Sequence, residues 1–203
     1  MTRRGLTLLE LLIALTITSM IGLAMATTLV ASARSVQSAS EARSALQRFH
    51  ALRQRVRGYT DPALAVLASN DQQGFALWLH DENASNSVNL SELRVVWYEP
   101  DTQRVTLERV EFPEDWDDAQ VAAADTALAD GADPFLAMES QRLLDQTTTL
   151  VLADGIASTR LLFDDQIDVR DSVRPRLEVE IEMGDEMVPM AFAAPLRDHR
   201  ARP

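Results

Sequence analysis

The sequence predicts an α+β fold in which one long N-terminal helix is followed by antiparallel strands. Residues 11–33 form a largely apolar, uncharged run with the length of a membrane-spanning helix. Beyond it, apolar residues recur at steps of three and four as far as Val56, which is typical of an amphipathic helix. The rest of the chain alternates short β-branched and aromatic runs with turn residues, the pattern of an antiparallel α+β domain.

The first half of the helix combines a membrane span with one unusual charge. Arg3 and Arg4 precede the span, and 23 residues without a charge separate Glu10 from Arg34. A lone carboxylate at the mouth of an apolar run is costly in hydrocarbon and marks a functional position. Glu10 is therefore the first candidate site residue.

The second half of the helix, residues 34–57, is predicted to pack an apolar stripe on a globular domain. Six arginines and one acid occupy its other faces. We expect most of these arginines to be solvated, with the acidic domain or acidic neighbours as alternative partners. Gly58 and then Asp61-Pro62 are expected to end the helix. The stripe consists of Val36, Ala39, Ala42, Leu46, Phe49, Leu52 and Val56.

Residues 58–203 are predicted to form one acidic globular α+β domain. Residues 63–69 fit either a helical turn or a linker strand, and Pro189 limits the last strand to a sheet edge. Helices are expected within 117–130 and from Asp133-Pro134 onward. In the segment 104–112, apolar residues alternate with polar ones up to Leu107, and the pattern shifts by one position before Val110. Strands are expected at 74–80, 93–98 and 104–112, as an antiparallel meander, and at 149–153, 156–163, 177–183 and 188–193.

Charge and composition exclude several classes of function. Residues 58–203 hold 11 arginines against 29 acids, and the whole chain has a net charge of −12. Phosphate binding needs a basic face, so no nucleic-acid partner is expected. The chain has no cysteine, which excludes cysteine catalysis and cysteine-based zinc sites. It also lacks the common nucleotide-binding and nucleophile motifs, so no catalytic residue is predicted and we do not expect an enzyme.

No metal site or cofactor is predicted. His50, His80 and His199 are far apart in the sequence and lack ligand spacing. Calcium is the alternative for the acidic groups, because hard cations take several oxygen ligands. None of these groups has the Asp-x-Asp-x-Asp-Gly order, so solvated loops are the favoured interpretation. The groups are residues 114–118, residues 130–133, and Asp164, Asp165, Asp168 and Asp171.

The N-terminal segment has three interpretations. A cleavable secretory signal would end at Ala31-Ser32-Ala33, but Glu10 interrupts its core and the run exceeds the usual length of about 7–15 residues. A plain uncleaved anchor explains the length and the flanking arginines, yet it leaves Glu10 unexplained. A third interpretation accounts for every feature.

Residues 3–12, Arg-Arg-Gly-Leu-Thr-Leu-Leu-Glu-Leu-Leu, resemble the type IV prepilin motif. The resemblance implies that a prepilin peptidase cuts after Gly5 on the cytoplasmic side, and that Leu6 becomes the N-methylated first residue. Glycine suits such a site because a protease can grip its backbone closely. Leu6 departs from the more usual phenylalanine of the family but keeps an apolar side chain.

The resemblance also implies an assembly role for Glu10. Glu10 lies four residues after Leu6, about one helical turn from the new amine. In the family, this glutamate is thought to meet the N-terminal amine of a neighbouring subunit. An unpaired buried charge costs several kcal/mol, so such a pair would select correctly staggered subunits.

A pilin-like fold and a structural function follow from the resemblance. It implies a leader at 1–5, a transmembrane half-helix at 6–33, a periplasmic half-helix at 34–57 and a globular domain at 58–203. The strand order is similar to J-type minor pseudopilins or W-type minor pilins. A J-type subunit would sit in the inner membrane and join I- and K-like partners at the tip of a type II secretion pseudopilus. The alternatives are a minor type IV pilin for adhesion, motility or DNA uptake, and a signal-anchored binding domain.

Overall fold

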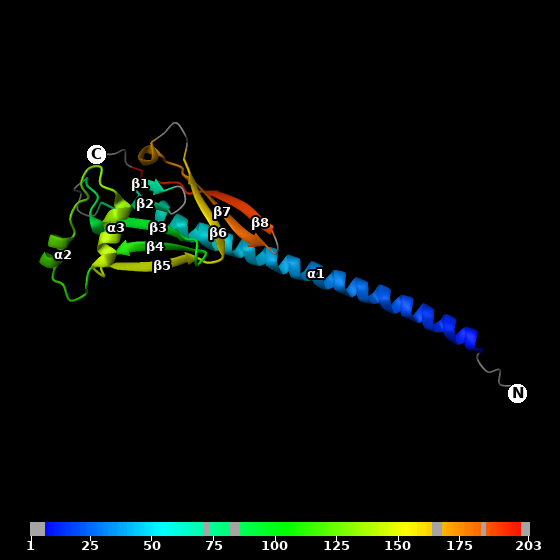
Figure 1. Ribbon diagram of the computed structural model, residues 1–203. Helices are drawn as coiled ribbons and strands as arrows, with labels where there is room; N and C mark the ends of the chain where they lie inside the picture. Colours follow the sequence, from blue (N-terminus) through cyan, green and yellow to red (C-terminus); the bar gives the residue numbers. More distant parts are fainter. Residues whose placement is uncertain (1–6, 71–73, 82–85, 164–167, 184–185, 200–203) are drawn as a thin grey trace. The chain divides into compact units, whose positions relative to one another are not determined.

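The computed structural model describes residues 7–70, 74–81, 86–163, 168–183 and 186–199. The chain divides into two compact units, one reaching Ser44 and the other starting at Ala45. A single helix, α1 (Leu8–Thr60), runs through the first unit and supplies its last turns to the second (Figure 1). The second unit adds two antiparallel sheets and two short α-helices, which confirms the predicted α+β class.

Helix α1 ends where proline forces it to end. The N–H of Asp61 donates to the carbonyl of Arg57 at 2.9 Å, and Pro62 has no N–H with which to continue the ladder. Gly58 does not end the helix as predicted. It lies inside α1 with nothing within 4 Å of the position that a Cβ would occupy. The loss of about 1 kcal/mol for a helical glycine is therefore tolerated one turn before the stop.

The buried face of α1 repeats at steps of three and four residues. The predicted stripe is right at Phe49, Leu52 and Val56. It is wrong at Val36, which is 68% exposed, at Ala39, which is exposed, and at Leu46, which is 47% exposed. Ala45 takes the buried position instead. At this turn the buried face of α1 therefore passes through Ala45, one residue before the predicted Leu46, and the small side chain of Ala45 contacts the core.

The first sheet has five antiparallel strands in the order β1-β2-β3-β4-β5. The predicted meander of three strands is confirmed and is extended by one strand at each edge. The ambiguous segment 63–69 contributes a strand rather than a helical turn. The strands are β1 (Ala65–Asn70), β2 (Gly74–Trp78), β3 (Leu93–Glu99), β4 (Arg104–Val110) and β5 (Thr147–Ala153).

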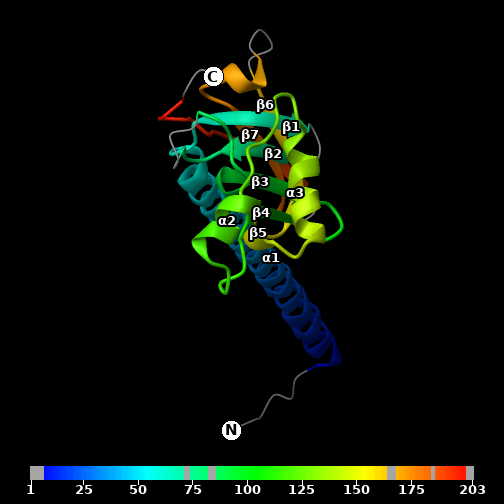
Figure 2. The ribbon, with the colours of Figure 1, turned by 90° about the vertical axis from the view of Figure 1, so that its left-hand side faces the viewer.

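Both faces of this sheet are covered. Val105 and Leu107 of β4 share a core with Leu52 of α1, whereas Val110 packs with Met138 of α3 (Pro134–Leu143) on the other face. Figure 2 shows α3 in front of the strands and α1 behind them. The shift in apolar pattern before Val110 therefore needs no distortion of the strand. Val110 faces the other side of the sheet, and a strand that is buried on both faces does not alternate simply between apolar and polar residues.

The second sheet has three antiparallel strands in the order β6-β7-β8, formed by β6 (Ile156–Leu162), β7 (Arg176–Met183) and β8 (Glu186–Ala193). Val179 and Ile181 join the same core as α1, and the rings of Phe49 and Phe192 meet edge-on with centroids 5.7 Å apart. Pro189 lies on an edge strand, as predicted. One core thus joins α1 to both sheets.

The helix predicted within 117–130 is much shorter than expected. Helix α2 (Asp118–Ala124) stops because the backbone that follows pairs with another segment. The N–H of Leu90 donates to Thr126, and the N–H of Leu128 donates to Val88. These backbone bonds are incompatible with a continuing helix. The helix predicted from Asp133-Pro134 is confirmed as α3, with Asp133 accepting the N–H of Phe135 at its start.

Gly74 begins β2 at a position that admits no side chain. Its φ is +150°, and a Cβ would lie 1.9 Å from the carbonyl oxygen of Val96. We expect Gly74→Ala to lower the free energy of unfolding by about 3 kcal/mol, through backbone strain and overpacking. Urea unfolding of the detergent-solubilised chain, followed by tryptophan fluorescence, measures this. Gly58→Ala is the control, because its site is open and helical, and equal unfolding midpoints for both variants would contradict the prediction.

Candidate processing and assembly site

The start of α1 has a reciprocal hydrogen-bond pair that explains the Thr-x-x-Glu spacing. Gly5 and Leu6, the predicted cleavage and methylation residues, lie outside the described residues. Thr7 is the first described residue. Its N–H donates to Glu10 Oε2 at 2.9 Å, and the N–H of Glu10 donates to Thr7 Oγ1 at 3.3 Å. This arrangement is a capping box, which satisfies backbone N–H groups that the first turn of a helix leaves without partners.

The capping box fixes where the candidate assembly carboxylate lies. Oε2 of Glu10 accepts from both the N–H and the hydroxyl of Thr7, each at 2.9 Å. Among the described residues, no donor reaches Oε1. The carboxylate therefore stays at the positive end of the helix dipole, with one oxygen open to a further donor. The interaction of Glu10 with a neighbouring subunit stays a prediction.

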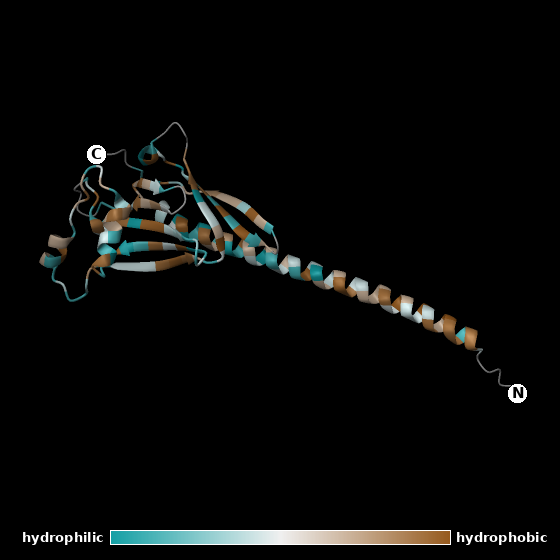
Figure 3. Ribbon diagram, viewed as in Figure 1, coloured by the Kyte–Doolittle hydropathy of each residue, from teal (hydrophilic) through white to brown (hydrophobic). Residues whose placement is uncertain are grey.

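The segment after Glu10 exposes its apolar side chains. Within the described residues, α1 is the one helix long and apolar enough to cross a membrane, and none of its 18-residue apolar window is buried. Figure 3 colours most of this segment brown or white. Such a surface needs lipid or other apolar helices to cover it.

The hydroxyl groups in this segment are compatible with lipid. Thr16 donates to the carbonyl of Ile13 at 2.8 Å, Thr18 donates to Ala14 at 2.8 Å, and Thr27 donates to Ala24 at 2.9 Å. A hydroxyl bonded to its own helix carries no unpaired donor into hydrocarbon. The predicted transmembrane half therefore needs no outside partner for these groups.

Three of the six arginines of residues 34–57 are bound to the domain instead of being solvated. Arg48 donates to the carbonyl of Gly155 at 3.3 Å, and Arg55 donates to that of Leu152 at 2.6 Å. Arg57 lies 3.7 Å from the carboxylate of Asp61. Two of the three thus use backbone carbonyls rather than acidic side chains, a pairing that sequence charge alone does not reveal.

A buried ion pair, not predicted from the sequence, fixes α3 to the first sheet. Glu108 of β4 is completely buried and accepts hydrogen bonds from Trp97 Nε1 and Arg142 Nε, both at 2.8 Å. The guanidinium of Arg142 also lies 5.5 Å from the centre of the Trp97 ring. Burial raises the pKa of Glu108, but hydrogen bonds from Arg142, Thr147 and Trp97 together lower it further, so the carboxylate is charged at neutral pH. The pair is structural, because α3 covers it.

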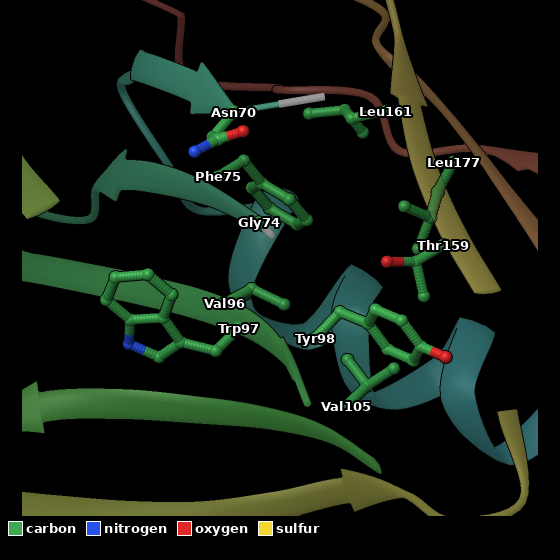
Figure 4. A pocket seen from close by; sticks show the side chains of 10 residues that line it. All are labelled: Asn70, Gly74, Phe75, Val96, Trp97, Tyr98, Val105, Thr159, Leu161 and Leu177. Atoms are coloured by element: carbon green, nitrogen blue, oxygen red, sulfur yellow. The ribbon is translucent and has the colours of Figure 1, made fainter. Parts of the chain in front are cut away.

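Two of the cavities that the described residues form lack a nucleophile beside a base. Figure 4 shows the crevice between the two sheets, where Phe75 and Tyr98 face Leu161 and Leu177; its volume is about 10 Å³, room for a single water molecule. A larger cleft of about 230 Å³ lies beside Trp78 and is lined mainly by apolar residues, with Asp130 and Arg170 among them. A nucleophile next to a base, the arrangement that covalent catalysis needs, is found in neither lining.

Two histidines that are distant in sequence line one depression. His80 and His199 lie there with Asp81 and Asp198. Among the described residues, no group of three or more histidine or acidic side chains has an arrangement that could hold a metal ion. Several acids of the predicted calcium groups serve local structure instead, since Asp117, Asp133 and Asp168 each cap the start of a helix. Asp164 and Asp165 lie outside the described residues, and calcium stays the alternative to the predicted solvated loops.

Comparison with known families concerns the N-terminus alone. The model of the prokaryotic N-terminal methylation motif matches residues 1–26. The chain carries the methylation motif of type IV pilin and pseudopilin precursors. Comparisons with curated proteins and with solved structures give no match. The capped helix start and the exposed apolar turns described above lie inside the matched residues.

The motif has consequences for processing and partners. It implies cleavage by prepilin peptidase and assembly with other pilin subunits, and it indicates a structural subunit. The motif coincides with the one helix of the described residues that is long and apolar enough to cross a membrane. The long helix followed by antiparallel sheets is a pilin-like α+β architecture.

Proposed function

We propose that the chain is a minor pseudopilin of a type II secretion system. It is inserted once in the inner membrane, with its acidic domain in the periplasm, and it joins the tip of a pseudopilus with I- and K-like subunits. The observation that carries the proposal is the methylation motif in register with a capped, exposed, membrane-length helix that continues into the core of an α+β domain. The alternative in the same class is a minor type IV pilin, because the motif serves both kinds of filament.

The proposal gives Gly5, Leu6 and Glu10 separate roles, and the geometry at Thr7 and Glu10 supports the last of them. Cleavage after Gly5 leaves Leu6 with a charged amine beside the membrane. Glu10 is held by Thr7 at the start of the helix, and its Oε1 faces no donor among the described residues. The amine of a neighbouring subunit suits this oxygen, because pairing removes two charges that would otherwise be isolated in hydrocarbon.

N-terminal sequencing and intact mass of the membrane-extracted protein test the processing step. A mature chain that begins at methylated Leu6 supports the proposal. A chain that begins at Arg34, after a signal-type cleavage at Ala33, contradicts it. Deletion of the gene then separates the two filament classes, since exported enzymes accumulate in the periplasm if secretion fails and surface pili disappear if the filament is a pilus.

Two substitutions separate the effect of the Glu10 charge from the effect of the capping box. Glu10→Gln retains a capping side chain at the third helical position but removes the charge, so we expect normal cleavage and at least about a tenfold loss of incorporation into filaments. Thr7→Val removes the hydroxyl but keeps the carboxylate and the backbone N–H that donates to it, so assembly should fall less than in Glu10→Gln. Incorporation is measured by quantifying the subunit in sheared filament fractions. Equal assembly of Glu10→Gln and the wild type would contradict the pairing role.

A further inference from the structure

The outer edge of β8 offers unpaired backbone groups. The N–H of Ala194 donates to the carbonyl of Pro175 at 2.8 Å, which fixes the alternation of the β7–β8 ladder. From this register, Ala191 and Ala193 direct their N–H and C=O groups away from β7. No described residue hydrogen-bonds to these outward groups. Pro189 lies on the same outward side without an N–H, so the C-terminal part of β8 supplies the adjacent pair of open donors.

Three arginines surround this part of the edge. Arg53 and Arg57, one helical turn apart on α1, line a depression of about 380 Å³ together with Arg174, Ala191 and Ala193. We call Arg53, Arg57 and Arg174 the arginine cluster. Within the described part of the chain, Arg53 and Arg174 form no ion pair.

Two acids of this region are already engaged in other ion pairs. Asp61 is shared between Arg57, at 3.7 Å, and Arg197, at 3.5 Å. Glu178, opposite Ala191 on β7, pairs with Arg176 at 3.4 Å. A positive depression therefore persists on a domain with 29 acids against 11 arginines in residues 58–203.

Parts of the β5 and β1 edges are contacted by the chain itself. Arg55 donates to the carbonyls of Val151 and Leu152 on β5. Strand β1 contacts the 3₁₀ helix η2 (Val169–Asp171), whose Arg170 donates to Leu67 at 3.0 Å. Natural proteins block free edges because these pair readily with other chains. Among the described residues, the C-terminal end of β8 has no such contact from an arginine side chain.

We propose that the edge of β8 and the arginine cluster dock an extended acidic segment of a neighbouring subunit. The segment adds to β8 as a further strand, with main-chain hydrogen bonds to Ala191 and Ala193, while its carboxylates pair with the arginine cluster. Charge complementarity argues for this occupant, and the open backbone groups favour a polypeptide over a lipid headgroup. The source of the segment, a filament neighbour, rests on the proposed function.

Fluorescence anisotropy with an acidic peptide tests the site on the full chain in detergent micelles. The probe is a labelled hexapeptide of alternating aspartate and valine, and its backbone N-methylated form is the control for strand pairing. We expect binding that weakens as salt rises, and roughly a tenfold higher Kd for Arg53→Glu/Arg174→Glu. Ala191→Pro removes an outward N–H without breaking the β7–β8 ladder, and it should weaken binding as well.

The controls distinguish a specific binding site from nonspecific electrostatic attraction of the acidic peptide. Arg104→Glu changes the charge of an exposed arginine on β4 and should leave the Kd unchanged. Equal binding of the N-methylated peptide, equal binding to Arg53→Glu/Arg174→Glu, stronger binding of anionic lipid vesicles, or no binding at low salt would overturn the proposal. Competition by unlabelled full chain would support it and identify a second copy as the source. N-terminal processing is measured separately, so failure of the docking site and failure of the proposed function are distinguishable.

Discussion

Arg142→Met is expected to lower the free energy of unfolding by about 2–3 kcal/mol at pH 7. The substitution leaves the carboxylate of Glu108, which is fully buried, without its cationic partner. Breaking a buried ion pair in this way typically costs about 3–5 kcal/mol. The lower figure applies here because the Arg142 side chain is 53% exposed and Trp97 still donates to Glu108. Equilibrium unfolding in urea, followed by tryptophan fluorescence, measures the loss.

The pH dependence of this loss has a definite sign. In the wild type, the pKa of Glu108 lies below its ordinary value, so its contribution to stability is present above the unfolded pKa and is lost as pH falls through the folded one. Without Arg142, burial dominates and raises the pKa. The charged form is then penalised above the folded pKa, so the difference between variant and wild type should shrink as pH falls from 7 to 4.

Matched variants separate this pair from ion pairs in general. Arg109→Met breaks the pair with Glu111, in which both side chains are 48% exposed, and should change stability little. Glu108→Gln/Arg142→Met removes the buried charge but keeps an acceptor for Trp97, and should recover most of the loss. If Arg109→Met and Arg142→Met were equally destabilised, the buried carboxylate would not be the cause.

The sequence was informative where one physical cause dominates a segment. The α1 helix, the edge position of β8 and the start of α3 were predictable, since apolar periodicity and proline act locally. The length of α2 was not, because the residues after Ala124 pair with Val88 and Leu90 from a distant segment. Tertiary hydrogen bonding overrides local propensity there.

The functional residues also divide into those that a local sequence signal reveals and those that only the fold brings together. Glu10 was identifiable as a charge in an apolar run, and the Thr-x-x-Glu spacing also contains the capping box, a local signal that the charge alone does not reveal. The Glu108–Arg142 pair joins residues 34 apart in sequence, and the arginine cluster brings Arg174 next to Arg53 and Arg57. Only the fold creates these neighbours. Charge counts located an acidic domain but not the positive depression within it.

Gly5→Val is expected to leave the whole population in the precursor form. The peptidase must bind the backbone on both sides of the bond it cuts, and a branched side chain at the last leader residue obstructs that approach. Intact mass would then show the uncleaved chain in the membrane fraction, because the apolar run of residues 11–33 is unchanged. Without a free amine at Leu6, the precursor cannot supply the charge that a neighbouring subunit's glutamate needs, so it should also be excluded from filaments.

A second glycine in the same helix provides the control for this variant. Gly22 lies inside the apolar run with nothing within 4 Å of the position that a Cβ would occupy, so Gly22→Ala should be cleaved normally. Under the signal-peptide interpretation the cut follows Ala33, and Gly5→Val would have no effect on it. Cleavage of Gly5→Val at Leu6 would show that the peptidase does not need glycine here. Cleavage at Ala33 would replace the pilin-like interpretation with a secreted or anchored binding domain.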